Sequence, residues 1–155
     1  MNKKNSFTYR ISSAEFTTHV HATEDLDKVK QALLFLIPED IHDKLKLKVD
    51  KVRGHWNNPI SLLKTKFTDT DDIMQIIKYI TTGLDDQDKY VLSEGLERRI
   101  DKSRLYLRFD KQAAFKGHFK LRDEDDVVRI TISFAIYPSP THEKVKSICE
   151  SLLME

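Results

Sequence analysis

The chain has 155 residues, of which 39% are hydrophobic and 33% charged, and Gly and Pro occur only four times each. This composition supports one folded domain with its own core and excludes a disordered or low-complexity chain. The formal net charge is +1, so any strongly basic surface must arise from uneven placement of the charges. We expect a single domain over residues 1–155, with residues 1–6 as a disordered or fraying tail.

The single cysteine and the N-terminal sequence bear on the cellular compartment. Cys149 excludes an intramolecular disulfide and a thiolate metal cluster, and it favours a reducing environment. The N-terminal residues lack an apolar signal core, and no apolar run approaches the ~20 residues that cross a bilayer. We therefore expect a cytoplasmic protein with no membrane partner.

Residues 7–22 alternate between apolar and polar side chains, which is typical of a half-buried strand. The alternation shifts phase near Ser12 and Ser13, so we expect a β-bulge there. With that bulge, His19 and His21 should point away from the core.

Four segments carry the apolar spacing and capping residues of amphipathic helices, at residues 23–36, 68–83, 85–100 and from 141 onward. Thr23 is the expected N-cap of the first helix. Acidic clusters open the second and third helices, where they suit the positive end of the helix dipole. We therefore favour capping over a metal site at these clusters.

Two neighbouring strands are expected to concentrate basic charge, at residues 44–53 and 60–67. The lysines expected to point outward from these strands include Lys46, Lys48, Lys64 and Lys66. Between positions 44 and 66, seven basic residues accompany one acidic residue, which leaves a local surplus of six positive charges.

Residues 105–117 combine a strand pattern with an unusual polar corner. The side chains expected to point outward are Tyr106, Arg108 and Asp110, followed at the corner by Lys111 and Gln112. A polar strand end with a bulged turn and a binding site explain this segment equally well.

Two further strands are expected at residues 118–121 and 128–136, the first of them short. The full order is then β-α-β-β-α-α-β-β-β-α. Consecutive strands joined by short turns predict an α+β fold with a single, mostly antiparallel sheet. Helices should pack on one face of that sheet and leave the other face open.

The outward side chains of this sheet would converge on the open face. They are Lys46, Lys48, Lys64, Lys66, Tyr106, Arg108 and Arg129. Cations on a flat platform neutralise phosphates, and interleaved aromatic rings, including Trp56 in the loop at 54–59, can stack unpaired bases. A solvated, lysine-rich face that discourages aggregation is the alternative.

An enzyme would need a recognisable constellation of catalytic residues, and the sequence shows none of the common motifs. His55 or His118 with Asp110 and Lys111 could form a small metal-independent nuclease, although no sequence feature brings them together. His19 and His21 lack an evident third metal ligand. We expect a protein without catalytic activity, metal or cofactor.

The chain resembles an archaeal family of predicted RNA-binding proteins, also described as predicted exosome subunits. The resemblance rests on three blocks: residues 19–25 (HVHATED), residues 54–60 (GHWNNPI) and residues 105–117 (LYLRFDKQAAFKG). The second block departs from the family pattern, because Asn57 stands where the family usually has glycine.

This resemblance implies a fold like that of the ribosomal protein that holds 5S rRNA in the large subunit. It also implies RNA binding, with RNA-processing proteins as further partners. The residues carried over from the family blocks are His55, Asn58, Pro59, Arg108, Asp110, Lys111 and Gln112. In this reading Asp110 orients Arg108 or Lys111, or else caps the corner, and Gln112 bonds a base or sugar.

RNA binding without catalysis is therefore the leading hypothesis. A protein-interaction or assembly module, including a homodimer that pairs through the sheet, is the alternative from another class. The small nuclease is the third hypothesis.

Overall fold

The protein forms one antiparallel sheet of six strands in the order β2-β3-β1-β6-β5-β4. The computed structural model describes residues 7–53 and 58–154, so the expected tail at residues 1–6 lies outside the described part. The strands are β1 (Thr8–His21), β2 (Lys48–Arg53), β3 (Pro59–Phe67), β4 (Ile100–Asp101), β5 (Arg104–Asp110) and β6 (Val127–Tyr137). The predicted α+β class is confirmed.

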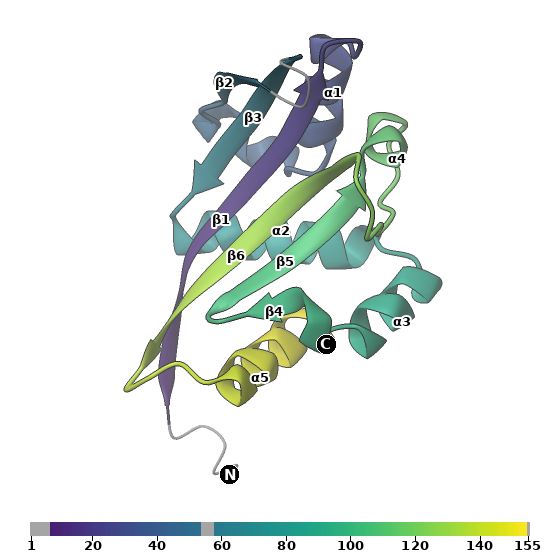
Figure 1. The fold of residues 1–155 in the computed structure, drawn as a ribbon. Coiled ribbons are helices and arrows are strands. Elements are labelled where there is room, and N and C mark those ends of the chain that lie inside the picture. Colours follow the sequence, from purple (N-terminus) through teal and green to yellow (C-terminus); the bar gives the residue numbers. More distant parts are fainter. Residues whose placement is uncertain (1–6, 54–57, 155) are drawn as a thin grey trace.

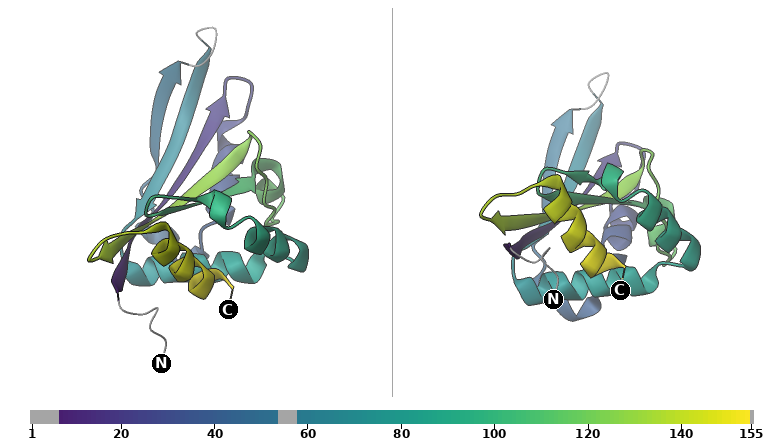
Figure 2. Two further views of the ribbon diagram at one scale, coloured as in Figure 1. Left: turned by 60° about the horizontal axis from the view of Figure 1, so that its bottom comes forward. Right: turned by 90° about the horizontal axis from the view of Figure 1, so that it is seen from below.

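The helices form a second layer behind the sheet, and the sheet face turned toward the viewer in Figure 1 carries none of the described helices. They are α1 (Leu26–Phe35), α2 (Thr70–Gly83), α3 (Asp86–Glu94), α4 (Lys111–Phe115) and α5 (His142–Leu153), with 3-10 turns η2 (Glu39–Lys44) and η4 (Glu97–Arg99). The β2–β3 hairpin extends beyond this two-layered body (Figure 2). No helix in the described ranges is long and apolar enough to cross a membrane.

The core fills the space between the helices and the inner face of the sheet. Phe16 of β1 and Phe109 of β5 are completely buried there. A register shift between Ile11 and Ser13 keeps the apolar side chains of β1 on the inner face, which confirms the expected bulge. Burial alternates along β1, and His19 and His21 are exposed, which confirms that both point away from the core.

Two expected helix boundaries are wrong. The N-cap of α1 is Asp25 rather than Thr23, because the Asp25 carboxylate accepts a hydrogen bond from the Asp27 amide at 2.9 Å. The third expected helix ends at Glu94, and Gly95 is its C-cap. A Cβ at Gly95 would lie 2.7 Å from the Arg98 guanidinium and 3.2 Å from the Val91 carbonyl, so a larger residue here would require the Arg98 side chain to move.

The expected strand at 44–53 begins late, at Lys48. Its first residue, Lys44, closes η2 instead, and its ammonium lies 2.9 Å from the buried Asp72 carboxylate at the start of α2. Packing of Ile41 in the core favours this 3-10 turn over an extended chain.

The expected strand at 118–121 is reduced to one bridge between Phe109 and Leu121. The Leu121 amide donates to the buried Asp88 carboxylate at 3.0 Å rather than to a strand. In place of that expected strand, the sheet contains the short strand β4, in which Ile100 and Asp101 pair with β5.

Cys149 lies on α5 with no exposed surface, and burial raises the pKa of its thiol to about 12. Because the thiolate is the reactive form, we expect no reaction with a disulfide reagent in the native protein. Colorimetric thiol titration should give no signal without denaturant and one thiol per chain in 6 M guanidinium. Rapid labelling of the native protein would contradict the buried position.

Candidate nucleic-acid interface

Four basic side chains form a straight row across the open face of the sheet. Strand pairing places Lys48 opposite Lys64, Lys64 opposite Thr17, Thr17 opposite Arg129, and Arg129 opposite Arg108. Directly opposite residues share a face, so Lys48, Lys64, Arg129 and Arg108, which we call the cationic row, cross five strands with Thr17 in the middle. At about 4.8 Å per strand, the row is about 19 Å long.

The row contains two pairs of like charges in direct opposition, Lys48 with Lys64 and Arg108 with Arg129. Like charges opposite each other destabilise a sheet. Within the described residues, the only ion pair of the row joins Lys64 to Glu15 at 3.9 Å. That contact is long and exposed, so it offsets little of the repulsion. An anion bound along the row would relieve it.

Tyr106 lies beside the row on the same face of β5 as Arg108. The Arg129 guanidinium lies 5.7 Å from the centroid of the Tyr106 ring, in a cation–π contact. The aromatic group that could stack a base therefore adjoins the cations that could hold phosphates.

A hollow of about 420 Å³ adjoins the row where β1 and β6 meet. Its basic side is formed by His19, His21, Arg108 and Arg129, and its acidic side by residues 124–126 of the loop before β6. Burial, together with the charges of His21, Lys111 and Arg129, lowers the pKa of His19, so its imidazole is mostly neutral at pH 7. His19 therefore contributes little to the positive charge of this face at neutral pH.

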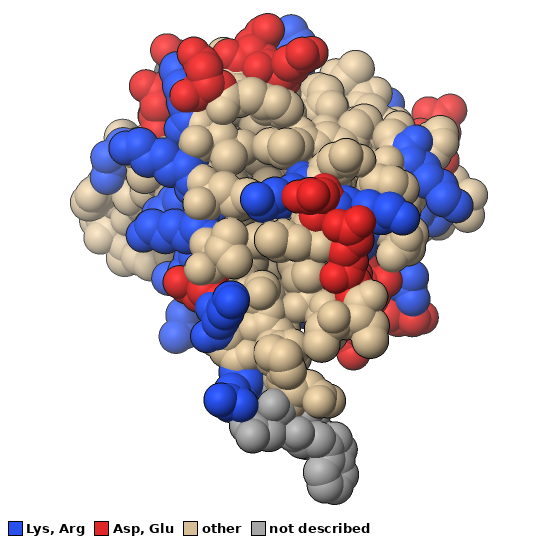
Figure 3. Space-filling view, turned by 90° about the horizontal axis from the view of Figure 1, so that it is seen from above, with Lys and Arg blue, Asp and Glu red and all other residues tan. Residues whose placement is uncertain are grey.

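Charges of both signs lie on the end of the molecule drawn in Figure 3. Lys and Arg side chains line the left side of this view, and others lie at its centre and right beside Asp and Glu. The acidic loop at 124–126 would repel a polyanion, so it limits the surface open to phosphates to the row itself.

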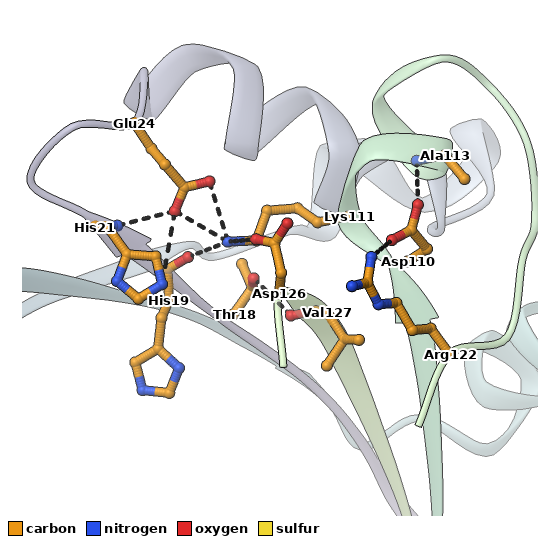
Figure 4. Close-up of polar contacts among 10 residues, drawn as sticks. All are labelled: Thr18, His19, His21, Glu24, Asp110, Lys111, Ala113, Arg122, Asp126 and Val127. Atoms are coloured by element: carbon orange, nitrogen blue, oxygen red, sulfur yellow. Dashed lines mark hydrogen bonds and ion pairs between the residues drawn. The ribbon is translucent and has the colours of Figure 1, made fainter. Parts of the chain in front are cut away.

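Lys111, expected to contact phosphate, is instead buried, with 2% of its surface exposed. Its ammonium donates to the His19 carbonyl at 2.7 Å and to the Glu24 carboxylate at 3.1 Å, and it lies 3.0 Å from Asp126 (Figure 4). We call Lys111, His19, Glu24 and Asp126 the Lys111 network. The ammonium is held by these three partners, so Lys111 has a structural role instead of the expected contact with phosphate.

Asp110 has two partners, neither of them Arg108 or Lys111. One carboxylate oxygen accepts from the Ala113 amide at 2.8 Å, which caps α4, and the other lies 2.8 Å from Arg122 (Figure 4). The expected bulged corner is therefore a short capped helix, and the capping alternative for Asp110 is the one observed. The contact with Arg122 could not be anticipated from residues 105–117 alone.

The other candidate residues divide by position. Lys66 is exposed on β3, and its register opposite Glu15 places it on the open face. Lys46 precedes β2, and Asn58 precedes β3. Gln112 lines a separate hollow with Lys28 and Phe115 between α1 and α4, away from the row. His55, Trp56 and Asn57 lie outside the described residues.

The residues proposed for a nuclease are not assembled as an active site in the described part of the chain. His118 is exposed, with its backbone amide bonded to the Ala113 carbonyl at 2.9 Å, whereas Asp110 and Lys111 are held by other partners. The described residues contain no group of three or more His, Cys, Asp or Glu side chains placed to hold a metal.

Fold and surface together define the class: an α+β protein with one face of its sheet open and crossed by cations. A family model described as RNA binding matches residues 13–134. Because this match spans most of the chain, the protein belongs to that RNA-binding family.

Archaeal relatives match almost the whole chain. An uncharacterised protein of Methanocaldococcus jannaschii is 35% identical over 142 residues, covering 89% of this chain and 95% of the relative. A Pyrococcus abyssi protein named as an RNA-binding protein is 32% identical over 137 residues, covering 87% and 89% respectively.

Solved structures of DUF54 proteins share the fold. The crystal structure of one from Archaeoglobus fulgidus has a TM-score of 0.81 at 32% identity, covering 92% of this chain and 99% of that one. Another from Sulfolobus solfataricus has a TM-score of 0.72 at 28% identity, covering 90% and 96%.

Proposed function

We propose that this protein binds RNA through the open face of its sheet, with phosphates seated along the cationic row. The observation that carries the proposal is the pairing of like charges across strands at both ends of the row. A sheet pays stability for such pairs, and a bound phosphate backbone would convert their repulsion into attraction. Membership of an RNA-binding family and the name of the Pyrococcus relative support RNA as the polyanion.

Binding in this proposal is not accompanied by catalysis. Asp110 and Lys111, which a nuclease at the corner would need, are engaged in structural contacts. Labelled RNA recovered from the binding reactions should therefore run at its original length on a denaturing gel. Products that disappear in a His118→Ala variant would favour the nuclease instead.

The test is a titration of fluorescently labelled RNA with wild type and with the Arg108→Ala/Arg129→Ala variant, across a salt series. Both arginines are exposed and have no ion pair within the described residues, so the variant should stay folded. Each lost phosphate contact should reduce the slope of log K against log salt by about 0.7 for a single strand. We expect the double variant to lose about 1.4 from this slope.

A matched variant, Lys78→Ala/Lys89→Ala, removes the same charge from exposed positions on α2 and α3. It should bind RNA with the wild-type slope. Equal weakening by both variants would show a nonspecific effect of net charge and would contradict a site on the open face.

Assembly through the β2 edge is a second candidate, because all six residues of β2 are exposed. Val49 and Val52 are each 43% exposed, and an open edge strand can pair with another chain. A second copy or an RNA-processing protein would be the partner. Analytical ultracentrifugation tests this role. A dimer that becomes a monomer on Val52→Lys substitution would support it. A monomer at all concentrations would exclude a homodimer.

A further inference from the structure

We propose that a hollow beside Tyr106 holds one unpaired base, so that the protein prefers single-stranded RNA to duplex RNA. This inference rests on the proposed function and goes further, because it names the form of RNA and the residues that select it. The cationic row alone would hold any phosphate backbone, whereas a base site distinguishes unpaired strands from paired ones.

The hollow has a volume of about 230 Å³ and lies beside the row at β5. The residues that line it are Arg98, Arg99, Tyr106, Arg108 and Asp123. Arg108 belongs to both the hollow and the row, so a base in the hollow would be continuous with phosphates on the row. The volume is below the ~300 Å³ at which pockets for whole small molecules begin, which suits a single planar group.

Tyr106 supplies a stacking surface whose position is fixed by its strand and by one neighbouring cation. Its backbone is fixed in β5 opposite Thr131, and the Arg129 guanidinium lies 5.7 Å from the ring centroid. A base that stacked on the ring would therefore extend an existing arrangement of guanidinium and ring without ordering a mobile side chain. Stacking on such a ring tolerates any base, since every base has a π-face.

The lining of the hollow is rich in guanidinium hydrogen-bond donors. Arg99 is 6% exposed, and its guanidinium is paired with the Asp123 carboxylate at 2.8 Å. Its Nε–H finds no acceptor within the described residues. The Arg98 and Arg108 guanidiniums line the same hollow, whose single carboxylate is that of Asp123. Carbonyl and ring-nitrogen acceptors on a base edge fit this donor-rich lining.

A duplex cannot use this site, because its bases are stacked inside the helix and its deep major groove excludes side chains. A single strand can place phosphates on the row and turn one base toward Tyr106. The same face should therefore bind both forms through charge and add the stacking contribution for the single strand alone.

The test compares Tyr106→Leu and Tyr106→Phe with wild type, using a labelled ten-nucleotide single strand and its duplex. Leu keeps much of the volume but has no π-face, and Phe restores the ring. We expect Tyr106→Leu to bind the single strand about 5- to 100-fold more weakly, with an unchanged salt slope because no cation is lost. Tyr106→Phe should bind it like wild type, and the duplex should bind all three proteins equally.

Urea unfolding of each variant establishes that it remains folded. Wild-type affinity of Tyr106→Leu for the single strand, or tighter binding of wild type to the duplex, would overturn the base site while leaving RNA binding intact. Failure of wild type to bind either RNA would instead overturn the proposed function, and the two results are distinguishable because wild type still binds RNA in the first case.

Discussion

Replacing Lys111 with Met should destabilise the folded protein by about 3 kcal/mol, because it removes the cation at the centre of the Lys111 network. The buried ammonium neutralises two carboxylates and occupies the His19 carbonyl. Loss of one partner from a buried ion pair costs about 3–5 kcal/mol. The low end applies here because Glu24 and Asp126 keep 20% and 35% of their side-chain surface exposed and can be partly solvated.

The network also explains why the effect should be global. Through Lys111 it joins the end of β1, the start of α1, the start of α4 and the residue before β6, segments that are far apart in the sequence (Figure 4). Urea denaturation should therefore show one cooperative transition at a lower midpoint with an unchanged slope.

Lys116→Met is the matched control, because Lys116 follows the same short helix but is exposed. It should change the free energy of unfolding by no more than about 0.5 kcal/mol. Glu24→Gln alone and in combination with Lys111→Met should give a coupling energy above about 1 kcal/mol. Equal stability of the two methionine variants would show that the network contributes little.

Removing all four cations of the row should nearly abolish RNA binding at physiological salt. At about 0.7 per contact, the variant with Ala at Lys48, Lys64, Arg108 and Arg129 should lose about 2.8 from the salt slope. Relief of the two like-charge pairs should leave its stability equal to or above that of wild type. Affinity by fluorescence anisotropy and stability by urea unfolding should thus move in opposite directions.

The sharpest control uses the same sheet face. Arg10 and Arg104 are exposed at its other end, opposite Ala135 and Ser133 respectively. Arg104 is four residues from Arg108, or about 13 Å along the strand. Alanine at Arg10, Arg104, Lys78 and Lys89 removes the same total charge and should leave most of the slope. Equal losses in the two quadruple variants would contradict a site defined by the row.

Alternation of apolar and polar residues was sufficient to predict most strands and the face to which each side chain belongs. The bulge near Ser12 and the outward positions of Lys64 and Arg108 follow from that local pattern. What local pattern cannot supply is register, because five elements separate β2 from β5 in the sequence and three other strands lie between them in the sheet. The sequence could therefore predict a basic sheet face, but not the alignment of its cations in one row.

The burial of Lys111 is a second feature that the local sequence could not predict. A lysine at a polar corner is ordinarily solvated, and nothing in residues 105–117 indicates that it is buried. Its burial depends on Glu24, 87 residues earlier, and on Asp126 beyond the next loop. Residues 19–25 and 105–117 were two of the blocks that carried the family resemblance, and the network joins them structurally. A shared block can thus reflect a fold contact as well as a ligand contact.

Mapping of backbone amide shifts during titration with single-stranded RNA would show whether RNA lies on the open face along the cationic row. We expect the largest shifts in β2, β3, β1, β6 and β5, around Lys48, Lys64, Thr17, Arg129 and Arg108. Shifts confined to the helical layer, at α2, α3 and α5, would contradict it.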